Sequence, residues 1–445
     1  MTEANPTVEA HYKTLEAEWN SVDGSLEFER LVVPTGNNDS AYHRWFHLKE
    51  AFSVDLLPSI LKRLSLEGKR ELRILDCFAG GGTTLVSALE MQPQTRVIAT
   101  GIEQNPFLHH VSNTKVKSLQ AGRTLALQLR ESFKDVKRIY TSDLLYKAKT
   151  PALSTFSNED YFPPALLAKL LRIRQAIKFC DGSTLAKDVL LTAAASCVES
   201  TSRLRRDGRA LRYAAERQPR EPWVEFSSRV QQMIEDIDST TSKGGAATIH
   251  RGDGRRPLLH IDTSAKQDLV VFSPPYPNNI DYTEIYKTEA WYLGFYEDAQ
   301  EFRSQRFRTL RSHPSVRFKD EYDFESSPDA QAVHALLNPI LSAVPDDRYS
   351  AGRTQLIKGY ADDMLTLFRQ LREIISNEGR LVYVVGNSAH GSGNALFVIA
   401  ADLVMARLAE LAHWRVEEIS VARSLRRRTT NSRFLRESVV TLAPA

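Results

Sequence analysis

Short apolar runs that end at a glycine, a proline or an acidic residue alternate along this chain with longer stretches of helical spacing. The run "ELRILD", residues 71–76, leads into a glycine turn and a helical segment, and "TRVIATGIE", residues 95–103, follows as a second strand. A strand, a helix and a strand in this order form a βαβ unit, whose strands pair in parallel through a right-handed crossover. The pattern predicts an α/β fold with a parallel sheet.

The second half of the chain repeats this alternation. We expect strands in "AATIHRGDG", residues 246–254, and "DLVVFSPPY", residues 268–276, and then a helix rich in aromatic residues. A helix, a glycine turn and a strand follow over residues 361–388, and another helix and strand over residues 395–425. "ESVVTLAP", residues 437–444, reads as the last strand. The tally is about seven strands interleaved with helices.

Strand signals vanish in the middle of the chain, where helical periodicity dominates. Residues 41–68 also have helical apolar spacing and end at a glycine. The predicted organisation is an N-terminal leader (1–40), a first part of the core (41–106), a mostly helical insertion (107–245) and a second part of the core (246–445) with a polar insertion near 299–349.

Composition adds exclusions. The chain has 445 residues, 42% of them hydrophobic and 25% charged, with a net charge of +3, which is ordinary for a soluble globular protein. The three cysteines Cys77, Cys180 and Cys197 have no paired spacing, so we expect neither a disulfide framework nor a structural metal site. The acidic N-terminus predicts no secretory signal, and no apolar run reaches the ~18 residues of a membrane span. We therefore expect a cytoplasmic protein without a membrane partner.

The stretch "DCFAGGGTT", residues 76–84, stands where a strand ends and a helix begins, which is where α/β sheets bind ligands. Gly82 is followed by Thr83 rather than lysine, so a Walker loop is excluded. Leu85 stands where a dinucleotide fingerprint needs its third glycine. S-adenosylmethionine is the alternative ligand, with Glu103 at the end of the next strand to hold its ribose. The competing interpretation is a tight turn that binds nothing.

The tetrapeptide "SPPY", residues 273–276, follows a buried strand directly. Two prolines fix the backbone. The Ser273 hydroxyl and the Pro274 carbonyl could then accept hydrogen bonds from an exocyclic amine and aim its lone pair at a methyl group. Tyr276 offers a face on which a flipped base can stack. The competing interpretation is a proline-rich end of a strand.

Together, "DCFAGGGTT", "GIEQNP" and "SPPY" resemble the motifs of the amino-methylating DNA methyltransferases. Serine at the first place of the tetrapeptide is similar to the cytosine-N4 branch, whereas the adenine-N6 branch more often has aspartate. The resemblance covers roughly residues 42–106 and 246–445. It implies a seven-stranded Rossmann-like core that depends on S-adenosylmethionine and transfers a methyl to cytosine N4 in duplex DNA, in a restriction-modification setting.

The resemblance also implies roles for single residues. The methionine end of the cofactor would be lined by Asp76, Phe78, Gly80 and Gly82, with Thr84 also among the cofactor-binding residues. Glu103 would bind the ribose, and Asp253 matches the acid that recognises the adenine amine. The catalytic residues would be Ser273, Pro274, Pro275 and Tyr276, with no metal.

Three alternatives follow from the same residues. The glycine turn precedes the tetrapeptide here, whereas many cytosine-N4 enzymes have the reverse order, so adenine N6 stays open as the target. A non-catalytic nucleic-acid-binding protein on a methyltransferase fold is the second alternative. A nicotinamide dehydrogenase is disfavoured by the failed dinucleotide fingerprint. Methylation at cytosine carbon needs a Pro-Cys pair, which none of the three cysteines provides.

Arginine is concentrated in three segments, and the guanidinium fork suits phosphate. The clusters contain Arg203, Arg205, Arg206, Arg209, Arg212, Arg217 and Arg220; Arg423, Arg426, Arg427, Arg428, Arg433 and Arg436; and the arginines of "RSQRFRTLRSHPSVRFK", residues 303–319. Beside a base-methylation motif they predict double-stranded DNA as partner, with the helical insertion as a candidate DNA-binding or target-recognition region. The competing interpretation is solvated ion pairs. The resemblance further implies a cognate restriction endonuclease as partner.

Overall fold

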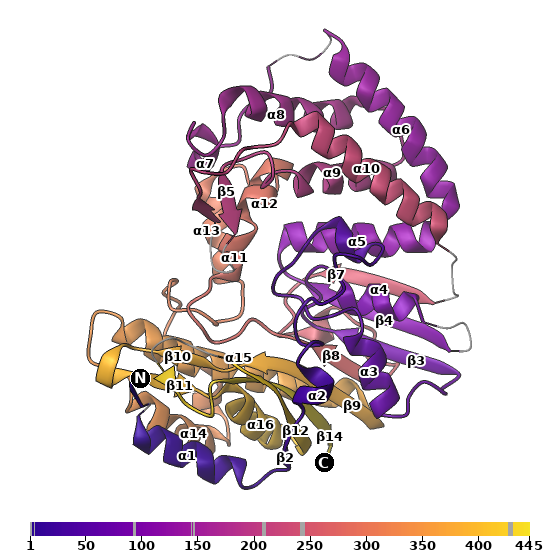
Figure 1. Ribbon diagram of the computed structural model, residues 1–445. Coiled ribbons are helices and arrows are strands. Elements are labelled where there is room, and N and C mark those ends of the chain that lie inside the picture. Colours follow the sequence, from indigo (N-terminus) through magenta and orange to yellow (C-terminus); the bar gives the residue numbers. More distant parts are fainter. Residues whose placement is uncertain are drawn as a thin grey trace.

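A computed structural model describes residues 2–3, 5–91, 95–143, 145, 147–206, 211–240, 245–425 and 430–445. Its centre is one twisted eight-stranded sheet (Figure 1). In spatial order the strands are β2 (Ser21–Asp23), β12 (Trp414–Ser424), β14 (Arg436–Pro444), β9 (Ile375–Gly386), β8 (Gln267–Phe272), β3 (Glu71–Asp76), β4 (Arg96–Glu103) and β7 (Ala246–Arg251).

The neighbouring strands β9, β8, β3, β4 and β7 all pair in parallel. The C-terminal strands β12 and β14 form an antiparallel pair that joins the sheet at β9. The prediction of an α/β Rossmann-like fold with a mainly parallel sheet is confirmed. Seven of the eight strands match the predicted tally, and the eighth, β2, is a short edge strand.

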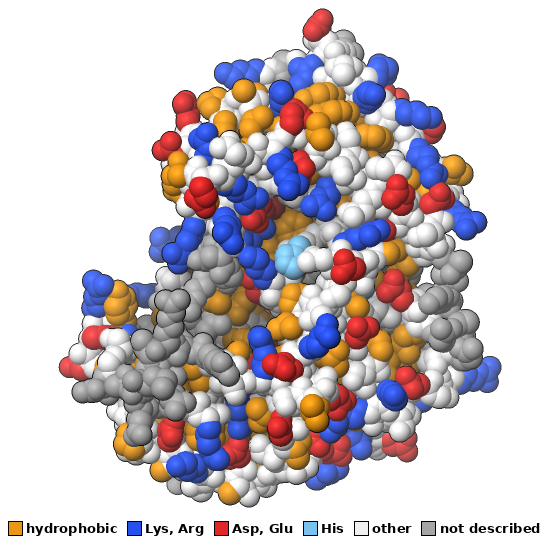
Figure 2. Space-filling view, in the orientation of Figure 1, with side chains coloured by type: hydrophobic (Ala, Val, Ile, Leu, Met, Phe, Trp, Pro, Cys, Tyr) orange, Lys and Arg blue, Asp and Glu red, His pale blue; other side chains and the backbone are white. Residues whose placement is uncertain are grey.

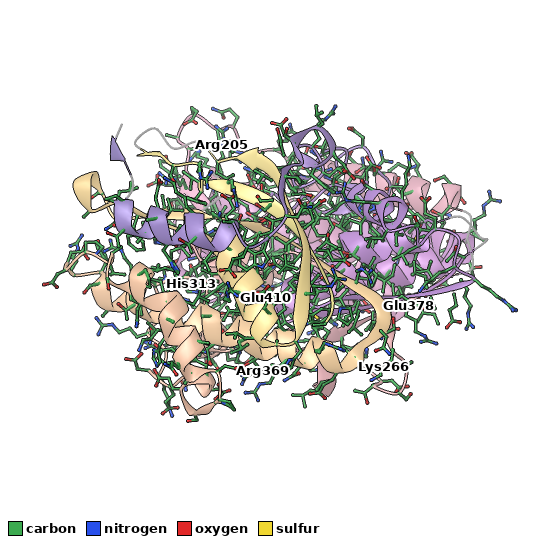
Figure 3. All side chains as sticks on the ribbon, turned by 90° about the horizontal axis from the view of Figure 1, so that it is seen from below. Arg205, Lys266, His313, Arg369, Glu378 and Glu410 are labelled. Carbon is green, nitrogen blue, oxygen red and sulfur yellow. The ribbon has the colours of Figure 1, made fainter. Side chains whose placement is uncertain are left out.

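Both faces of the sheet are buried, which is why its central strands are nearly continuous apolar runs whose successive side chains point to opposite faces. In β8, Leu269 and Val271 belong to one hydrophobic core, and Val270 and Phe272 belong to the other. The first core is covered by α3 (Leu56–Arg63), α4 (Thr83–Leu89) and α5 (Pro106–Ala121). The second is covered by α1 (Pro6–Glu16), α14 (Ala330–Leu341), α15 (Ser350–Ile374) and α16 (Ala401–Leu411), which lie toward the viewer in Figure 3.

The first forty residues are built into this architecture rather than standing apart from it. Strand β2 pairs in parallel with residues 419–421 of β12. The buried Tyr12 hydroxyl donates to the carbonyl of Val398 at 2.9 Å. Arg436 donates to Glu16 at 2.5 Å, across 420 positions of sequence. The short helix α2 (Ser25–Phe28) then packs against β12.

The helix predicted over residues 41–68 forms only in part, so that prediction was wrong in its extent. The structure has a single 3₁₀ turn at His43–Trp45, and the α-helix α3 begins at Leu56. Hydrogen bonds to distant residues hold this part of the chain: the Trp45 indole donates to Asp236 of α10 (Pro222–Ser239) at 2.9 Å. The Asn37 side chain donates to the carbonyl of Phe52 and accepts from the backbone N–H of Val54. These tertiary contacts override the local spacing.

Between β4 and β7 the described chain is mainly helical (Figure 1). Helix α5 packs on β7 and α4, so it belongs to the layer that covers the sheet. Beyond it lies a bundle whose elements are α6 (Arg123–Thr141), α7 (Ser154–Ser157), α8 (Pro164–Phe179), α9 (Thr184–Ser196), α10 (Pro222–Ser239) and the hairpin of β5 (Leu204–Arg206) and β6 (Leu211–Tyr213).

The segment after the tetrapeptide connects the sheet with this bundle. It contains α11 (Tyr282–Ile285), α12 (Lys287–Leu293) and α13 (Ala299–Phe307), and α12 packs against both α9 and α5. The region near 299–349, which was expected to be a polar insertion, contains α13, α14 and a short 3₁₀ turn at Asp323–Ser326. Among the described helices, none is both long and apolar enough to cross a bilayer.

Candidate active site

The strand ends at β3, β4 and β8 open into one cavity of about 370 Å³. That volume lies within the ~300–1,000 Å³ of pockets that bind small organic ligands. Figure 2 shows the surface hollowed between the helical part above and the sheet below. The predicted residues that line the cavity are Asp76, Phe78, Gly80, Glu103, Asp253, Ser273, Pro274, Pro275 and Tyr276. Gly82 and Thr84 were also predicted, but they do not line it.

Gly82 and Thr84 instead stabilise the glycine turn on the side away from the cavity, through contacts with α5 and Asp76. Gly82 has a φ of +84°, which favours glycine, and a β-carbon there would lie 3.0 Å from the β-carbon of Ser112 in α5. The Thr84 hydroxyl donates to Asp76 at 2.5 Å. The other oxygen of Asp76 accepts from the backbone N–H of Phe78 at 2.9 Å. Burial raises the pKa of Asp76 to about 6.

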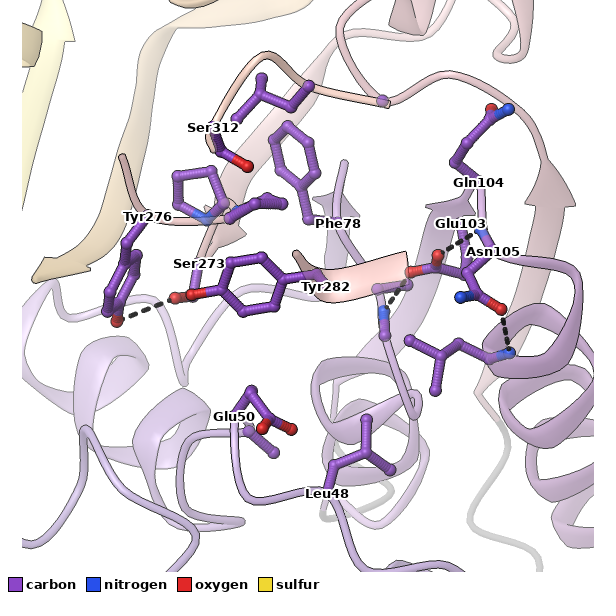
Figure 4. Close-up of a pocket in the computed structure, with 18 of the residues that line it drawn as sticks. Leu48, Glu50, Phe78, Glu103, Gln104, Asn105, Ser273, Tyr276, Tyr282 and Ser312 are labelled. Carbon is purple, nitrogen blue, oxygen red and sulfur yellow. Dashed lines mark hydrogen bonds between the residues drawn. The ribbon is translucent and has the colours of Figure 1, made fainter. Parts of the chain in front are cut away.

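Glu103 joins the ends of two strands through its carboxylate (Figure 4). One oxygen accepts from the N–H of Gly80 at 2.8 Å and the other from the N–H of Asn105 at 2.6 Å. Burial raises the pKa of this carboxyl to about 7. Each carboxylate oxygen has a second lone pair. The carboxylate therefore clamps the glycine turn and can still accept hydrogen bonds from the two hydroxyls of a ribose.

Asp253 lies at the cavity wall, but its carboxylate is already paired. The guanidinium of Arg255 donates to both of its oxygens, at 2.8 and 2.9 Å, and also reaches Asp363 at 3.0 Å. The next residue, Gly254, packs so closely that a β-carbon there would lie 1.9 Å from the carbonyl of Cys77. This loop is therefore fixed against the end of β3. Asp253 therefore stands at the cavity wall as half of an ion pair.

The tetrapeptide side chains are linked in a row that the sequence did not suggest. The Ser273 hydroxyl donates to the Tyr276 hydroxyl at 3.2 Å, and Tyr276 donates to Glu437 of β14 at 2.7 Å. The second oxygen of Glu437 accepts from the Nε of Arg423 in β12 at 2.6 Å. Burial and the neighbouring carboxylate hold the pKa of Tyr276 well above its usual value. No local motif around Glu437 signals this role.

The tyrosines after the tetrapeptide divide into two environments. The Tyr286 ring packs in the core under the guanidinium of Arg206, 4.9 Å from its centroid, and its hydroxyl donates to Glu50. Tyr286 is therefore a core residue that also lines the cavity. The Tyr282 ring projects across the cavity, close to the tetrapeptide (Figure 4), and its hydroxyl accepts from Asn278 at 3.1 Å. Tyr282 is thus a half-buried residue that lines the cavity.

Many of the arginines proposed to hold DNA are engaged in ion pairs. Arg206 is buried between Glu199 and Glu289, and Arg311 is held by Asp362 and Asp363. Further pairs are Arg217–Glu199, Arg220–Glu225, Arg306–Asp281, Arg423–Glu437, Arg433–Glu16 and Arg436–Asp402. By contrast, the side chains of Arg205, Arg303, Arg308 and Arg317 are exposed. Arg209, Arg426, Arg427 and Arg428 lie outside the described residues.

The described residues contain no group of three or more histidine, cysteine or acidic side chains with the geometry of a metal site. The three cysteines are all buried and free. Burial raises the pKa of Cys77, although this thiol lies beside the cavity. Cys77 is therefore held as a thiol rather than as a thiolate nucleophile.

Comparison with known proteins gives relatives that share most of the chain. It is 25% identical over 421 residues to Type II methyltransferase M.AvaI from Nostoc sp. and from Anabaena variabilis, covering 88% of this chain and 83% of theirs. It is 22% identical over 429 residues to Type II methyltransferase M.BsoBI from Geobacillus stearothermophilus, covering 86% and 80%. The chain is thus related along most of its length to Type II methyltransferases. No family model matches it.

Among solved structures, the rRNA methyltransferase aviRa from Streptomyces viridochromogenes aligns with a TM-score of 0.28 and 11% identity, covering 88% of this chain and 85% of that one. A second structure of the same enzyme aligns with a TM-score of 0.26. TM-scores this low support no conclusion about the fold or the substrate.

Proposed function

We propose that this protein is a DNA methyltransferase that transfers a methyl group from S-adenosylmethionine to an exocyclic amine, cytosine N4, in duplex DNA. The observation that carries the proposal is the meeting of two motif groups in one cavity. Glu103 and the glycine turn stand on one side, and Ser273 and Tyr276 on the other. The similarity to Type II methyltransferases over more than four fifths of each chain supports methyl transfer as the reaction.

S-adenosylmethionine suits the acceptors of the cavity. The buried carboxylates of Asp76 and Glu103 each retain lone pairs, and both stand at strand ends, where α/β folds bind ligands. Gly80 lines the cavity without a side chain, so a ligand can approach its backbone, whereas a β-carbon at Gly81 would collide with Leu48. When bound, this cofactor supplies an electrophilic methyl group on a sulfonium.

The tetrapeptide then acts on the amine that receives the methyl. Ser273 Oγ accepts one N–H bond of the amine and the Pro274 carbonyl accepts the other, so that the nitrogen lone pair is held toward the methyl. The rings of Tyr276 and Tyr282 line the same space and offer faces for a base taken out of the stack. The reaction needs no covalent intermediate, which agrees with Cys77 being held as a thiol.

Serine at position 273 supports cytosine N4 over adenine N6, because the adenine branch of the resembling family more often has aspartate there. The setting we propose is cytoplasmic restriction-modification, with a cognate restriction endonuclease as partner. The exposed Arg205, Arg303, Arg308 and Arg317 are the candidates for phosphate contacts, because their side chains reach solvent.

The test uses radiolabelled S-adenosylmethionine and duplex DNA of diverse sequence, followed by digestion to nucleosides and chromatography. Label in N4-methylcytosine is the expected result, and label in N6-methyladenine would move the enzyme to the other branch. Ser273→Ala should abolish labelling while cofactor binding by calorimetry persists. The matched control is Ser157→Ala, in an exposed position of α7. Cofactor binding without labelled DNA would overturn DNA as the substrate and move the search to RNA or protein. Absence of both cofactor binding and methyl transfer would favour the non-catalytic nucleic-acid-binding protein.

A further inference from the structure

The hydrogen-bond row from Ser273 to Arg423 has a defined direction. Glu437 is an acceptor when ionised, and the Nε of Arg423 donates to one of its oxygens at 2.6 Å. The other oxygen, 2.7 Å from the Tyr276 hydroxyl, can only receive that hydroxyl's proton. The Tyr276 oxygen is left as the acceptor for the Ser273 hydroxyl at 3.2 Å. The charge on Glu437 therefore orients every hydroxyl in the row.

This direction matters at the cavity end of the row. A serine hydroxyl has one proton and two lone pairs. Because the proton of Ser273 points to Tyr276, only its lone pairs remain for a ligand in the cavity. An amine that donates N–H meets an acceptor there, whereas an unoriented hydroxyl would also offer a proton. A donor facing a donor forms no hydrogen bond and leaves both groups unsatisfied.

The sheet makes the row possible. Glu437 pairs with Gly386 of β9 on one side and with Arg423 of β12 on the other. A β-carbon at Gly386 would lie 2.7 Å from the Tyr276 ring. Since Gly386 has no side chain, the ring lies over β9 and its hydroxyl reaches β14. Glu437 is buried, with 4% of its surface exposed, so water does not compete for the charge.

We propose that Glu437 is a positioning residue of this active site, which through Tyr276 holds Ser273 as an acceptor toward the substrate amine. The inference rests on the proposed function, because it specifies how Ser273 acts in that reaction. It also assigns Tyr276 a second role besides stacking. Arg423, one of the arginines expected to bind DNA, serves this row by fixing the outer oxygen of Glu437.

The variant Glu437→Gln tests the direction without changing the size of the side chain. Its amide oxygen would face Arg423, which offers only donors, so the amide NH₂ would face Tyr276 and donate to it. The phenol would then donate to Ser273, and the Ser273 proton would turn toward the cavity. We expect kcat to fall roughly 10- to 100-fold, the range of one charge-assisted hydrogen bond. KM for S-adenosylmethionine should stay near the wild-type value.

Two comparisons separate this mechanism from a general loss of structure. In a Tyr276→Phe background the relay is already cut, so adding Glu437→Gln should lower kcat no further. The control Glu417→Gln changes another ion-paired glutamate of the same sheet, a partner of Arg380, and should leave kcat unchanged. An equal loss from Glu437→Gln in both backgrounds, or an unchanged kcat, would overturn the proposal.

A second readout does not depend on methyl transfer. The ¹³Cζ resonance of Tyr276, assigned by its loss in Tyr276→Phe, reports whether the phenol donates to a carboxylate. It should shift in Glu437→Gln and stay in place in Glu417→Gln. An unshifted resonance would overturn the oriented row even in an inactive protein. If the wild type labels no DNA but the Tyr276 resonance still shifts in Glu437→Gln, only the proposed function is refuted.

Discussion

Gly386 and Glu437 stand directly opposite each other on β9 and β14, and the missing side chain at Gly386 opens the path by which Tyr276 reaches the Glu437 carboxylate. The Tyr276 ring occupies the space that a β-carbon at position 386 would need. A glycine near the end of a buried strand thus determines where the aromatic ring of the tetrapeptide lies.

Gly386→Ala should therefore impair activity more than its size suggests. The new methyl group pushes the Tyr276 ring aside and breaks its bond to Glu437, so we expect kcat to fall about tenfold. Overpacking should lower the free energy of unfolding by about 1–3 kcal/mol. Methylation kinetics and denaturant unfolding measure the two effects. Gly68→Ala is the control, because nothing lies within 4 Å of its β-carbon and it should change neither quantity.

Adjacent arginines offer a test of which basic residues contact DNA. Arg205 is exposed in β5, whereas Arg206 is buried between Glu199 and Glu289. Arg205→Ala should weaken DNA binding at low salt, reduce the salt dependence of affinity and leave stability unchanged. Arg206→Ala should cost about 3–5 kcal/mol of stability, because it leaves buried carboxylates unpaired. Equal effects of the two substitutions on folding would contradict this division.

Glu103→Gln should loosen the glycine turn. Both carboxylate oxygens accept backbone N–H groups, so an amide would set one NH₂ against a donor at Gly80 or Asn105. We expect the affinity for S-adenosylmethionine to fall roughly tenfold, which corresponds to about 1.4 kcal/mol. Calorimetric titration measures the affinity. Glu71→Gln, at the half-buried beginning of β3, is the control and should bind the cofactor as the wild type does.

Glu103 also predicts how stability depends on pH. Burial raises the folded-state pKa of its carboxyl from 4.5 to about 7. A raised pKa means that the folded protein binds this proton more tightly than the unfolded chain. The contribution of Glu103 to the free energy of unfolding is therefore fully present below pH 4.5 and is lost as pH rises through about 7. Unfolding free energies measured across this window should decline more steeply in the wild type than in Glu103→Gln. Parallel curves would contradict the raised pKa.

Lys115 predicts the opposite dependence of stability on pH. Burial lowers the pKa of this lysine in α5 from 10.5 to about 7, and its Nζ donates only to the carbonyl of His43, at 3.3 Å, among the contacts described. Its contribution is present above pH 10.5 and is lost as pH falls through about 7. Lys115→Met should stabilise the protein at pH 7, on the order of a few kcal/mol. A lower melting temperature for Lys115→Met would contradict this expectation.

The sequence predicted the features that are local in the chain. The strands alternate, the glycine turn follows β3 within a few residues, and the tetrapeptide follows β8 directly, so their neighbourhood follows from parallel topology. The row beyond Tyr276 could not be predicted this way. Glu437 lies 161 positions from Tyr276, and Glu50 lies 236 positions from Tyr286. Only the register of β9, β14 and β12 brings Glu437 to the tetrapeptide.

The arginines show the same limit. Arginines close together in the sequence suggested phosphate binding, but several of the acids that neutralise them are distant in sequence, as Glu16 is from Arg436. The failed helix over residues 41–68 has a related cause, since Trp45 near its start hydrogen-bonds to Asp236 of the distant helix α10. Local pattern predicts an element well only where tertiary partners agree with it.

The placement of the helical bundle has a consequence for how the chain folds. Strands β4 and β7 are neighbours in the sheet, yet residues 104–245 separate them. The pairing therefore closes a long loop, and such non-local pairing slows folding. During synthesis β4 is therefore complete long before its partner and presents a bare strand edge, which invites aggregation. Helix α5, the first element after β4, is then the first helix that can pack against this part of the sheet.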